Sequence, residues 1–201
     1  MAAVAITAVG GGTRRDKARA LSAHLIGLAA GGITVFVVAA GIGAAIPGAL
    51  RASLIPIAGA VGVTWGALKL LGRAPPVLSS AAQVPLSWRY TMERGQYLLA
   101  YGVGLGLGVF TRIYSLSLYL ALVLVIASGN ALLALLSGAC YGIARGLSVA
   151  VALCRSPDDG AEATQRFIAA LERTYGHAVR TDALCVTLVG LAAVVSGVYR
   201  G

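Results

Sequence analysis

Charge is scarce in this chain of 201 residues. Asp, Glu, Lys and Arg together make up 11%, and only seven of these residues are acidic. A soluble domain carries roughly 25% charged residues, and three stretches here, 20–50, 114–144 and 183–199, carry none at all. A helix needs about 17–25 apolar residues to cross a bilayer. The scarcity of charge therefore excludes an ordinary soluble domain and favours membrane-spanning helices.

Metal ligands and catalytic groups are equally sparse. The chain has three Cys and two His, which are too few and too scattered for a metal cage. His24 and His177 both fall at expected cytoplasmic edges of the membrane and make a poor haem pair. The sequence also has no Ser-His-Asp set and no paired carboxylates. We expect no metal, no cofactor and no recognisable catalytic site, although the sequence does not decide whether the protein is an enzyme.

Hydrophobic residues are abundant instead. They make up 58% of the chain, the mean hydropathy is +0.85, and there are 27 Gly. Small residues let membrane helices approach one another closely. We predict an all-α, polytopic transmembrane helical bundle of about five spans at 21–46, 53–71, 97–127, 131–153 and 183–199, preceded by a basic tail at 1–20. The transmembrane domain would thus cover 21–201, and its first partner would be the lipid bilayer.

The cations support this count of spans. With five spans, the tail, the 73–94 connector and the 155–182 segment fall on one side of the membrane and carry eleven Lys and Arg. The opposite side carries two, Arg51 and Arg200. Cytoplasmic loops are enriched in Lys and Arg, so we expect a cytoplasmic N-terminus and an outside C-terminus. The net charge of +9 then reflects topology, and we predict no nucleic-acid partner because no basic stretch is interleaved with aromatic residues.

The polar segment before the last span has its own pattern. Ser156, Pro157 and Asp158 form a helix-start signal, and apolar residues then recur on one face. We predict an amphipathic helix lying on the membrane at 158–176. A solvated linker helix is the open alternative.

The long third span is the most informative part of the sequence. Glycines at every second position, Gly102, Gly104, Gly106 and Gly108, form two overlapping small-xxx-small pairs that favour close helix packing. Arg112 follows at the centre of the 97–127 run, where a charge costs at least about 2.5–3.5 kcal/mol. We therefore predict a helix broken near the midplane, with Thr111, Arg112 and Tyr114 lining a substrate or partner site. The alternative is two short elements with Arg112 near an interface.

A second cation lies within the fourth span. Arg145 follows Tyr141 by one helical turn, and the five spans contain no acidic residue that could neutralise it. An anion, a lipid phosphate, backbone carbonyls or a partner's carboxylate must serve instead. We count Tyr141 and Arg145 as candidate binding residues, with an anionic small molecule as a candidate ligand.

The cysteines test a redox function. Cys140 lies inside the fourth span, whereas Cys154 ends that span and Cys185 begins the fifth. A disulfide needs Cα atoms within about 7 Å, so only Cys154 and Cys185 could meet. Unreactive small apolar residues in packed helices are the simpler interpretation.

Two stretches, "TVFVVAAGIGAAI" and "IPIAGAVGVTWGALKLLG", resemble the second and third spans of the cytochrome c biogenesis and disulfide reductase transmembrane family (CcdA/DsbD-like), which belongs to the LysE-type superfamily. Residues 101–145 are similar to that family's bent fourth span and its fifth, and "ALCVTLVGLAAVVSGVYRG" to its last. The resemblance implies an inverted-repeat helical fold bent at the midplane. The family's redox cysteines have no counterpart here, and most of its first span is missing. The resemblance therefore does not carry the electron relay to any residue of this chain.

Two functions from different classes follow. The first is a non-enzymatic membrane component, either a small transporter of an anionic solute or the membrane subunit of a larger complex. A chain this small would need a homo-oligomer or a partner subunit to close a pathway. The second is a thiol–disulfide electron carrier that relays reductant across the membrane. A structural membrane anchor, with Arg residues bound to lipid headgroups, is a further alternative.

Overall fold

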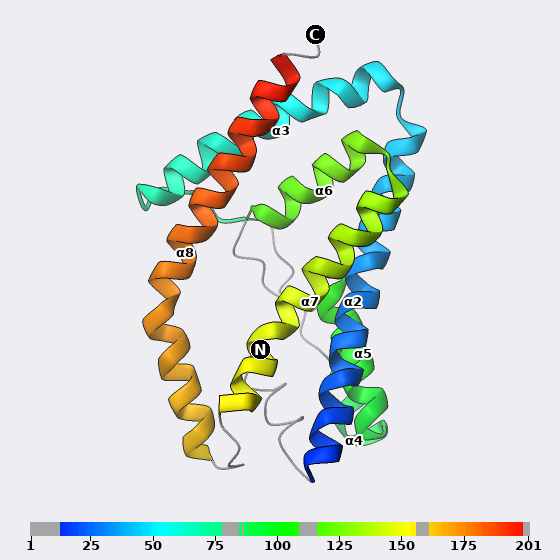
Figure 1. Cartoon of the computed structure of the whole chain (residues 1–201), viewed down its shortest axis with the longest axis vertical. Coiled ribbons are helices and arrows are strands. Elements are labelled where there is room, and N and C mark those ends of the chain that lie inside the picture. Colours follow the sequence, from blue (N-terminus) through cyan, green and yellow to red (C-terminus); the bar gives the residue numbers. More distant parts are fainter. Residues whose placement is uncertain (1–12, 78–84, 86, 109–115, 156–160, 199–201) are drawn as a thin grey trace. The chain divides into compact units, whose positions relative to one another are not determined.

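All regular structure in the described part of the chain is helical (Figure 1). The computed structural model describes residues 13–77, 85, 87–108, 116–155 and 161–198. Its helices are α2 (Arg14–Ala45), α3 (Gly48–Leu70), α4 (Trp88–Thr91), α5 (Arg94–Gly106), α6 (Ser117–Ser128), α7 (Ala131–Arg155) and α8 (Ala161–Val198). The all-α prediction is confirmed.

The chain folds into two compact units, each assembled from three separate segments. Unit 1 comprises residues 1–35, 80–112 and 136–173, and unit 2 comprises residues 36–79, 113–135 and 174–201. Unit 1 thus holds the first part of α2 with α4, α5 and most of α7. Unit 2 holds the end of α2 with α3, α6 and most of α8.

Local sequence signals explain several helix ends. Thr13 and Asp16 cap α2 reciprocally: the Thr13 N–H donates to Asp16 Oδ2 (3.0 Å), and the Asp16 N–H donates to Thr13 Oγ1 (3.3 Å). This arrangement is a capping box, and it starts α2 inside the stretch that we expected to be a tail. Between α6 and α7, Gly129 has a φ of 59°. Asn130 then accepts the Leu133 N–H at 3.0 Å and so starts α7.

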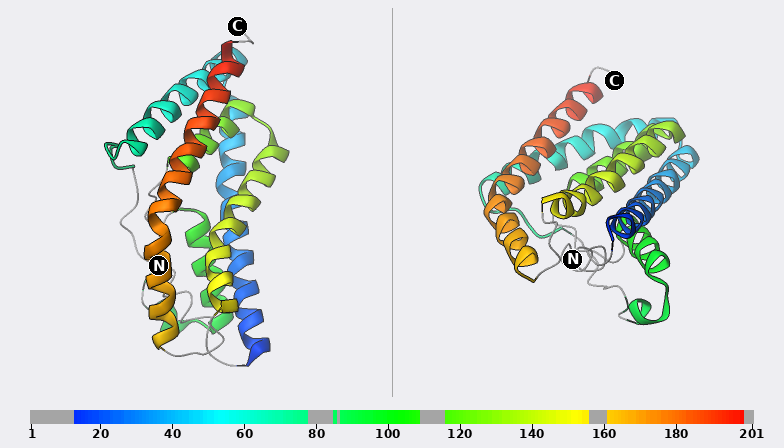
Figure 2. Two further views of the ribbon diagram at one scale, coloured as in Figure 1. Left: turned by 60° about the vertical axis from the view of Figure 1, so that its left-hand side comes forward. Right: turned by 60° about the horizontal axis from the view of Figure 1, so that its bottom comes forward.

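Glycine brings three helices of unit 1 into backbone contact (Figure 2). On one flank of α2, a Cβ added to Gly102 would overlap the His24 carbonyl oxygen, and one added to Gly106 would overlap the Leu28 carbonyl oxygen. On another flank, a Cβ added to Gly142 would lie 2.6 Å from the Leu28 carbonyl carbon. Real Cβ atoms do not come this close to backbone, so α5 and α7 each cross α2 at positions that only glycine fits.

Unit 2 uses the same device between α3 and α8. A Cβ added to Gly59 would lie 2.6 Å from the Gly190 carbonyl oxygen, and the reverse contact would be 2.7 Å. Beside this crossing, Trp65 and Val186 join Ala58 and Leu120 in a buried apolar cluster, which ties α6 to the same pair of helices. The unit is therefore held by close backbone contact on one side of α3 and by apolar side chains on another.

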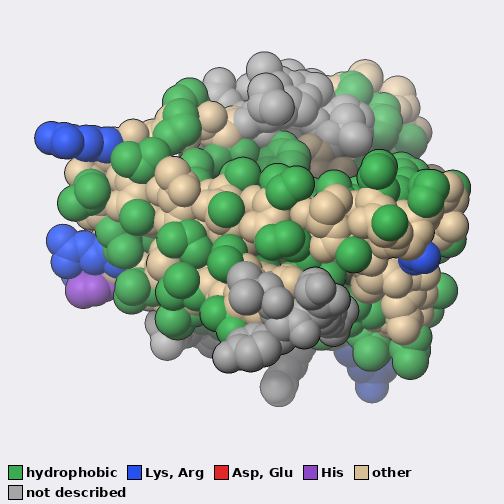
Figure 3. Space-filling view, turned by 90° about the horizontal axis from the view of Figure 1, so that it is seen from above, with side chains coloured by type: hydrophobic (Ala, Val, Ile, Leu, Met, Phe, Trp, Pro, Cys, Tyr) green, Lys and Arg blue, Asp and Glu red, His purple; other side chains and the backbone are tan. Residues whose placement is uncertain are grey.

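Three helical stretches are long and apolar enough to cross a membrane: Arg15–Ala45, Gly48–Leu70 and Glu172–Gly197. Shorter apolar helices lie at Ser117–Ser128 and Ala131–Leu147. Large hydrophobic side chains are exposed on these helices, including Ile26, Val38, Leu132, Leu147 and Leu188. Figure 3 shows hydrophobic side chains spread over one face, with Lys and Arg projecting at its margins.

Within the predicted third span, 97–127, α5 ends at Gly106 and α6 begins at Ser117. The run is therefore interrupted, as both the predicted broken helix and its alternative of two short elements require. Another pair of predicted elements differs from the structure. The amphipathic helix at 158–176 and the fifth span at 183–199 are not separated, because α8 runs without interruption from Ala161 to Val198. The sequence has no Pro after Pro157. Polar side chains at 172–182 change the surface of the helix without removing any of its backbone hydrogen bonds.

Candidate functional site

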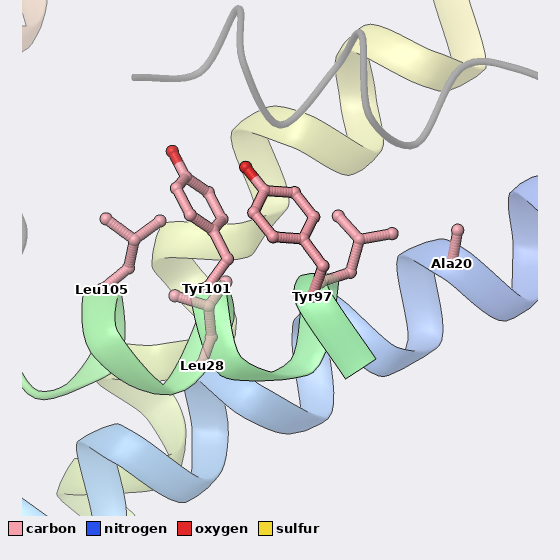
Figure 4. Close-up of a cluster of buried hydrophobic side chains, with 6 residues drawn as sticks. Ala20, Leu28, Tyr97, Tyr101 and Leu105 are labelled. Atoms are coloured by element: carbon pink, nitrogen blue, oxygen red, sulfur yellow. The ribbon is translucent and has the colours of Figure 1, made fainter. Parts of the chain in front are cut away.

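Unit 1 buries a histidine of α2 beside two tyrosines of α5. His24 of α2 is 1% exposed, and Tyr97 and Tyr101 of α5 are 6% and 2% exposed. The rings of His24 and Tyr101 stack with centroids 5.6 Å apart, and those of Tyr97 and Tyr101 stack at 5.8 Å. Figure 4 shows the two tyrosine hydroxyls pointing in the same direction from α5. The three rings therefore form one continuous stack.

The two nitrogens of the His24 ring have different surroundings. The Leu98 backbone of α5 lies near the ring. Nδ1 is buried and has no hydrogen-bond partner in the described part of the chain. A buried polar atom without a partner costs about 1–3 kcal/mol, so this atom requires an explanation.

Helix α7 adds the charged part of the site. Arg145 donates a hydrogen bond from Nη1 to the Tyr141 hydroxyl at 2.5 Å, and its guanidinium carbon lies 5.5 Å from the centroid of that ring. The Arg145 charge also lies close enough to act electrostatically on the Tyr101 hydroxyl. The sequence has no Asp or Glu from 94 to 157, so neither α5 nor α7 brings a carboxylate. We call His24, Tyr97, Tyr101, Tyr141 and Arg145 the unit-1 polar cluster.

The glycine crossings set the positions of these side chains. His24 precedes Gly27 by one helical turn, and Tyr101 precedes Gly102, so both flank the point where α2 meets α5. Arg145 follows Gly142, which lies against the Leu28 backbone where α7 meets α2. Three helices that approach so closely hold their flanking side chains at short range. The unit-1 polar cluster is thus a consequence of the packing.

Only some of the predicted site residues lie in the part of the chain that the structure describes. Thr111, Arg112 and Tyr114 lie outside the described residues. Tyr141 and Arg145 lie together in unit 1, as given above. Gly102 and Gly106 lie against α2, Gly104 is buried in α5, and Gly108 follows the end of α5 with a φ of 77°. That left-handed conformation favours glycine and marks the end of the helix.

The cysteines show no redox arrangement within the described residues. Cys140 and Cys185 are exposed free thiols. The side chain of Cys154 is not described, and Cys154 and Cys185 belong to different units. Within the same described stretches, no group of three or more His, Cys, Asp or Glu could hold a metal ion.

Sequence reasoning did not assign His24, Tyr97 and Tyr101 to a site. His24 was expected at a cytoplasmic edge, and the tyrosines were not considered as binding residues. One signal was available: His24 is the only titratable side chain in the charge-free run 20–50. Its neighbours in the cluster come from helices about 75 and 120 positions further along, so only the packing of α2 reveals them.

A comparison of the chain with protein-family models, with curated proteins and with solved structures finds no match.

Proposed function

We propose that this chain is a non-enzymatic integral membrane protein that binds an anionic small molecule at the unit-1 polar cluster, as a small transporter. Its spans are α2, α3, α7 and α8, together with the broken third span of the 97–127 run, which is made of α5 and α6. A helix rises 1.5 Å per residue, so α5 and α6 would each cover about 20 Å of a hydrocarbon core that is about 30 Å thick. They would serve as two halves of one broken span, with the N-terminus of the chain in the cytoplasm.

The observation that carries this proposal is the Arg145–Tyr141 pair beside buried His24 and Tyr101. Ionisable side chains within membrane helices are costly, and they mark substrate or ion pathways. A guanidinium presents several donors in a fixed fork that suits carboxylate and phosphate-like oxygens. Tyrosine hydroxyls add neutral donors beside it. The cluster holds one cation and neutral hydroxyl groups, so it favours an anion over a cation.

The experiment is a thermal-unfolding screen of the purified chain in detergent micelles. The sodium salts of chloride, sulfate, acetate, succinate and glutamate are compared at constant ionic strength, with gluconate as the reference. A ligand present at 100 times its Kd stabilises the folded state by about 2.7 kcal/mol. We expect one class of anion to raise the melting temperature of the wild-type protein well above the gluconate value.

Two variants complete the test. Arg145→Gln removes the cation of the cluster and should abolish the anion-specific rise. The matched control Arg180→Gln removes an exposed cation of α8 and should retain it. Equal responses of the two variants, or no anion effect on the wild type, would show that the cluster is not an anion site. Uptake of the stabilising anion into proteoliposomes then separates a transporter from a membrane subunit that only binds.

The subunit alternative has a different signature. If Arg145 pairs with a partner's carboxylate, the purified chain should associate with a second copy or another membrane protein, and Arg145→Gln should dissociate that assembly. Size-exclusion chromatography with light scattering gives the mass of the assembly. The thiol–disulfide carrier predicts instead that function depends on Cys154 and Cys185, which a variant with both replaced by Ser tests directly.

A further inference from the structure

The outer flank of α2 changes from charged to apolar along the helix. Arg15 and Arg19 are both exposed, and their i,i+4 spacing places them on the same face. Ser22, Ile26 and Ala30 continue that face and are also exposed, Ile26 to 61%. Because a helix rises 1.5 Å per residue, Ile26 lies about 10 Å and Ala30 about 16 Å beyond Arg19. We call these five residues the outer strip of α2.

A second helix adds positive charge beside this strip. Arg94, the first residue of α5, is exposed. Arg94 and Arg19 both lie near enough to the Asp16 carboxylate to act on it electrostatically. Asp16 Oδ2 accepts hydrogen bonds from the N–H and from the hydroxyl of Thr13, at 3.0 and 2.7 Å. That carboxylate therefore serves the cap of α2, and cations of two helices gather around it.

Helix α4 indicates the depth of this end of unit 1 in a membrane. Trp88 packs against the buried cluster that contains Ala20 of α2, whereas Tyr90 is 83% exposed. Trp and Tyr are enriched at the level of the lipid headgroups. Figure 1 shows α4 and the first turns of α2 at the same end of unit 1. The cations of the outer strip would thus lie among headgroups, and Ile26 would lie in hydrocarbon.

We propose that the outer strip of α2 binds one anionic phospholipid, whose phosphate lies between the two arginines and whose acyl chain follows Ile26 and Ala30. Charge favours this partner, because the segments 13–26 and 87–97 carry six Lys and Arg residues against two carboxylates. The apolar half of the strip favours a lipid over a soluble phosphate, which would bury no apolar surface there. The strip shares no residue with the unit-1 polar cluster, so this lipid site is separate from the proposed anion site.

Native mass spectrometry of the purified chain, released from detergent micelles, tests the proposal with defined lipids. The protein is freed of lipid and mixed with equal amounts of dioleoyl phosphatidylglycerol and dioleoyl phosphatidylcholine, which have the same acyl chains but different headgroup charges. Each Arg near an anionic surface strengthens the attraction by about fivefold. We expect the phosphatidylglycerol adduct of the wild-type protein to exceed the phosphatidylcholine adduct by about tenfold or more. Equal amounts of the two adducts would overturn the proposal.

Two double variants locate the site. Arg15→Gln/Arg19→Gln removes both cations of the outer strip and should lower the preference for phosphatidylglycerol by about fivefold or more. The control Arg173→Gln/Arg180→Gln removes the same charge from exposed positions of α8 and should keep the preference. All four side chains are exposed, so both variants should melt near the wild-type temperature. An unchanged preference in the first variant, or an equal loss in both, would show that the outer strip is not the lipid site.

A soluble headgroup separates a lipid site from a phosphate site. Glycerol 3-phosphate carries the charged part of the headgroup without acyl chains, and it should not displace phosphatidylglycerol at the same concentration. Displacement would mean that the apolar half of the strip takes no part in binding. Arg145→Gln, which removes the cation of the unit-1 polar cluster, should retain the full lipid preference. Loss of that preference in Arg145→Gln would show that the two sites are one.

Discussion

The backbones of Gly27 and Gly102 approach so closely that neither residue has room for a side chain. A Cβ on either glycine would lie 3.1 Å from the Cα of the other, and it would overlap a carbonyl oxygen of the facing helix, Leu99 for Gly27 and His24 for Gly102. This reciprocal contact joins α2 to α5 and sets the stack of His24 on Tyr101 beside it. Small residues at helix crossings let membrane helices pack through backbone contacts.

Gly27→Ala and Gly102→Ala should each destabilise unit 1. The added methyl group must push the helices apart or distort them, at a cost of about 1–3 kcal/mol. Thermal unfolding in micelles measures the loss. Gly41→Ala is the matched control, because a Cβ on that α2 glycine meets nothing within 4 Å. An equal loss in the control would show that general helix effects, and not the crossing, are responsible.

Gly129→Ala should be more costly than Gly72→Ala. Both glycines have positive φ, 59° and 70°, which costs an L-residue roughly 1–2 kcal/mol. A Cβ on Gly129 would also meet the Arg51 guanidinium, whereas one on Gly72 meets nothing within 4 Å. The difference in melting temperature between the two variants measures the contact with Arg51. That difference should vanish when both substitutions are repeated in an Arg51→Ala background.

Trp65→Phe should weaken unit 2 while the apolar cluster remains filled. The Trp65 Nε1–H donates to the Pro75 carbonyl oxygen at 3.3 Å, and Lys69 Nζ lies 4.8 Å from the centroid of the ring. Loss of the hydrogen bond should cost about 0.5–1.5 kcal/mol, with a smaller contribution from the weaker cation–π contact. Thermal unfolding measures the change against Tyr90→Phe, which alters an exposed hydroxyl. No difference between the two variants would mean that the Trp65 hydrogen bond does not stabilise the fold.

The membrane assignment predicts how the thiols react. Cys140 and Cys185 are exposed on apolar parts of α7 and α8, so in a bilayer both should face lipid. In a Cys154→Ser background, a membrane-impermeant maleimide should label neither thiol in intact or opened vesicles, and both after denaturation in detergent. His177→Cys, at an exposed position of α8, is the positive control and should react. Labelling of Cys185 before denaturation would place that part of α8 in water.

The continuity of α8 can be measured as a distance. Spin labels at Gly176 and Val195, both exposed in unit 2, should lie about 28 Å apart along a continuous helix that rises 1.5 Å per residue. Pulsed electron paramagnetic resonance gives this distance directly. A bend at the polar residues 177–182, as expected for an interfacial helix joined to a separate span, would shorten it. A broad distribution would contradict the continuous helix equally.

The sequence predicts the class of structure better than the site. The charge-free runs indicate apolar helices because charge in hydrocarbon is costly. The structure has long apolar helices over 20–50 and 183–197, and two shorter apolar helices over 114–144. The continuity of α8 was missed because side-chain polarity reports the surroundings of a helix, and a polar stretch without Pro can continue it. The stack of His24 on Tyr101 was missed because it depends on where α5 crosses α2. Paired glycines permit many crossings, and only the packed structure selects one.

Helix α2 has glycine contacts with three helices that are made after it, α5 through Gly27 and Gly31, α6 through Gly43 and α7 through Gly32. Synthesis proceeds from the N-terminus. Helix α2 would therefore leave the ribosome before the helices that cover His24 and its glycines have been made. Until residue 142 has been added, the α7 glycine that packs against Leu28 does not yet exist. The newly made chain would therefore depend on insertion factors or lipids to shield α2. Truncated products that end before α7 should be recognised and degraded by membrane quality control.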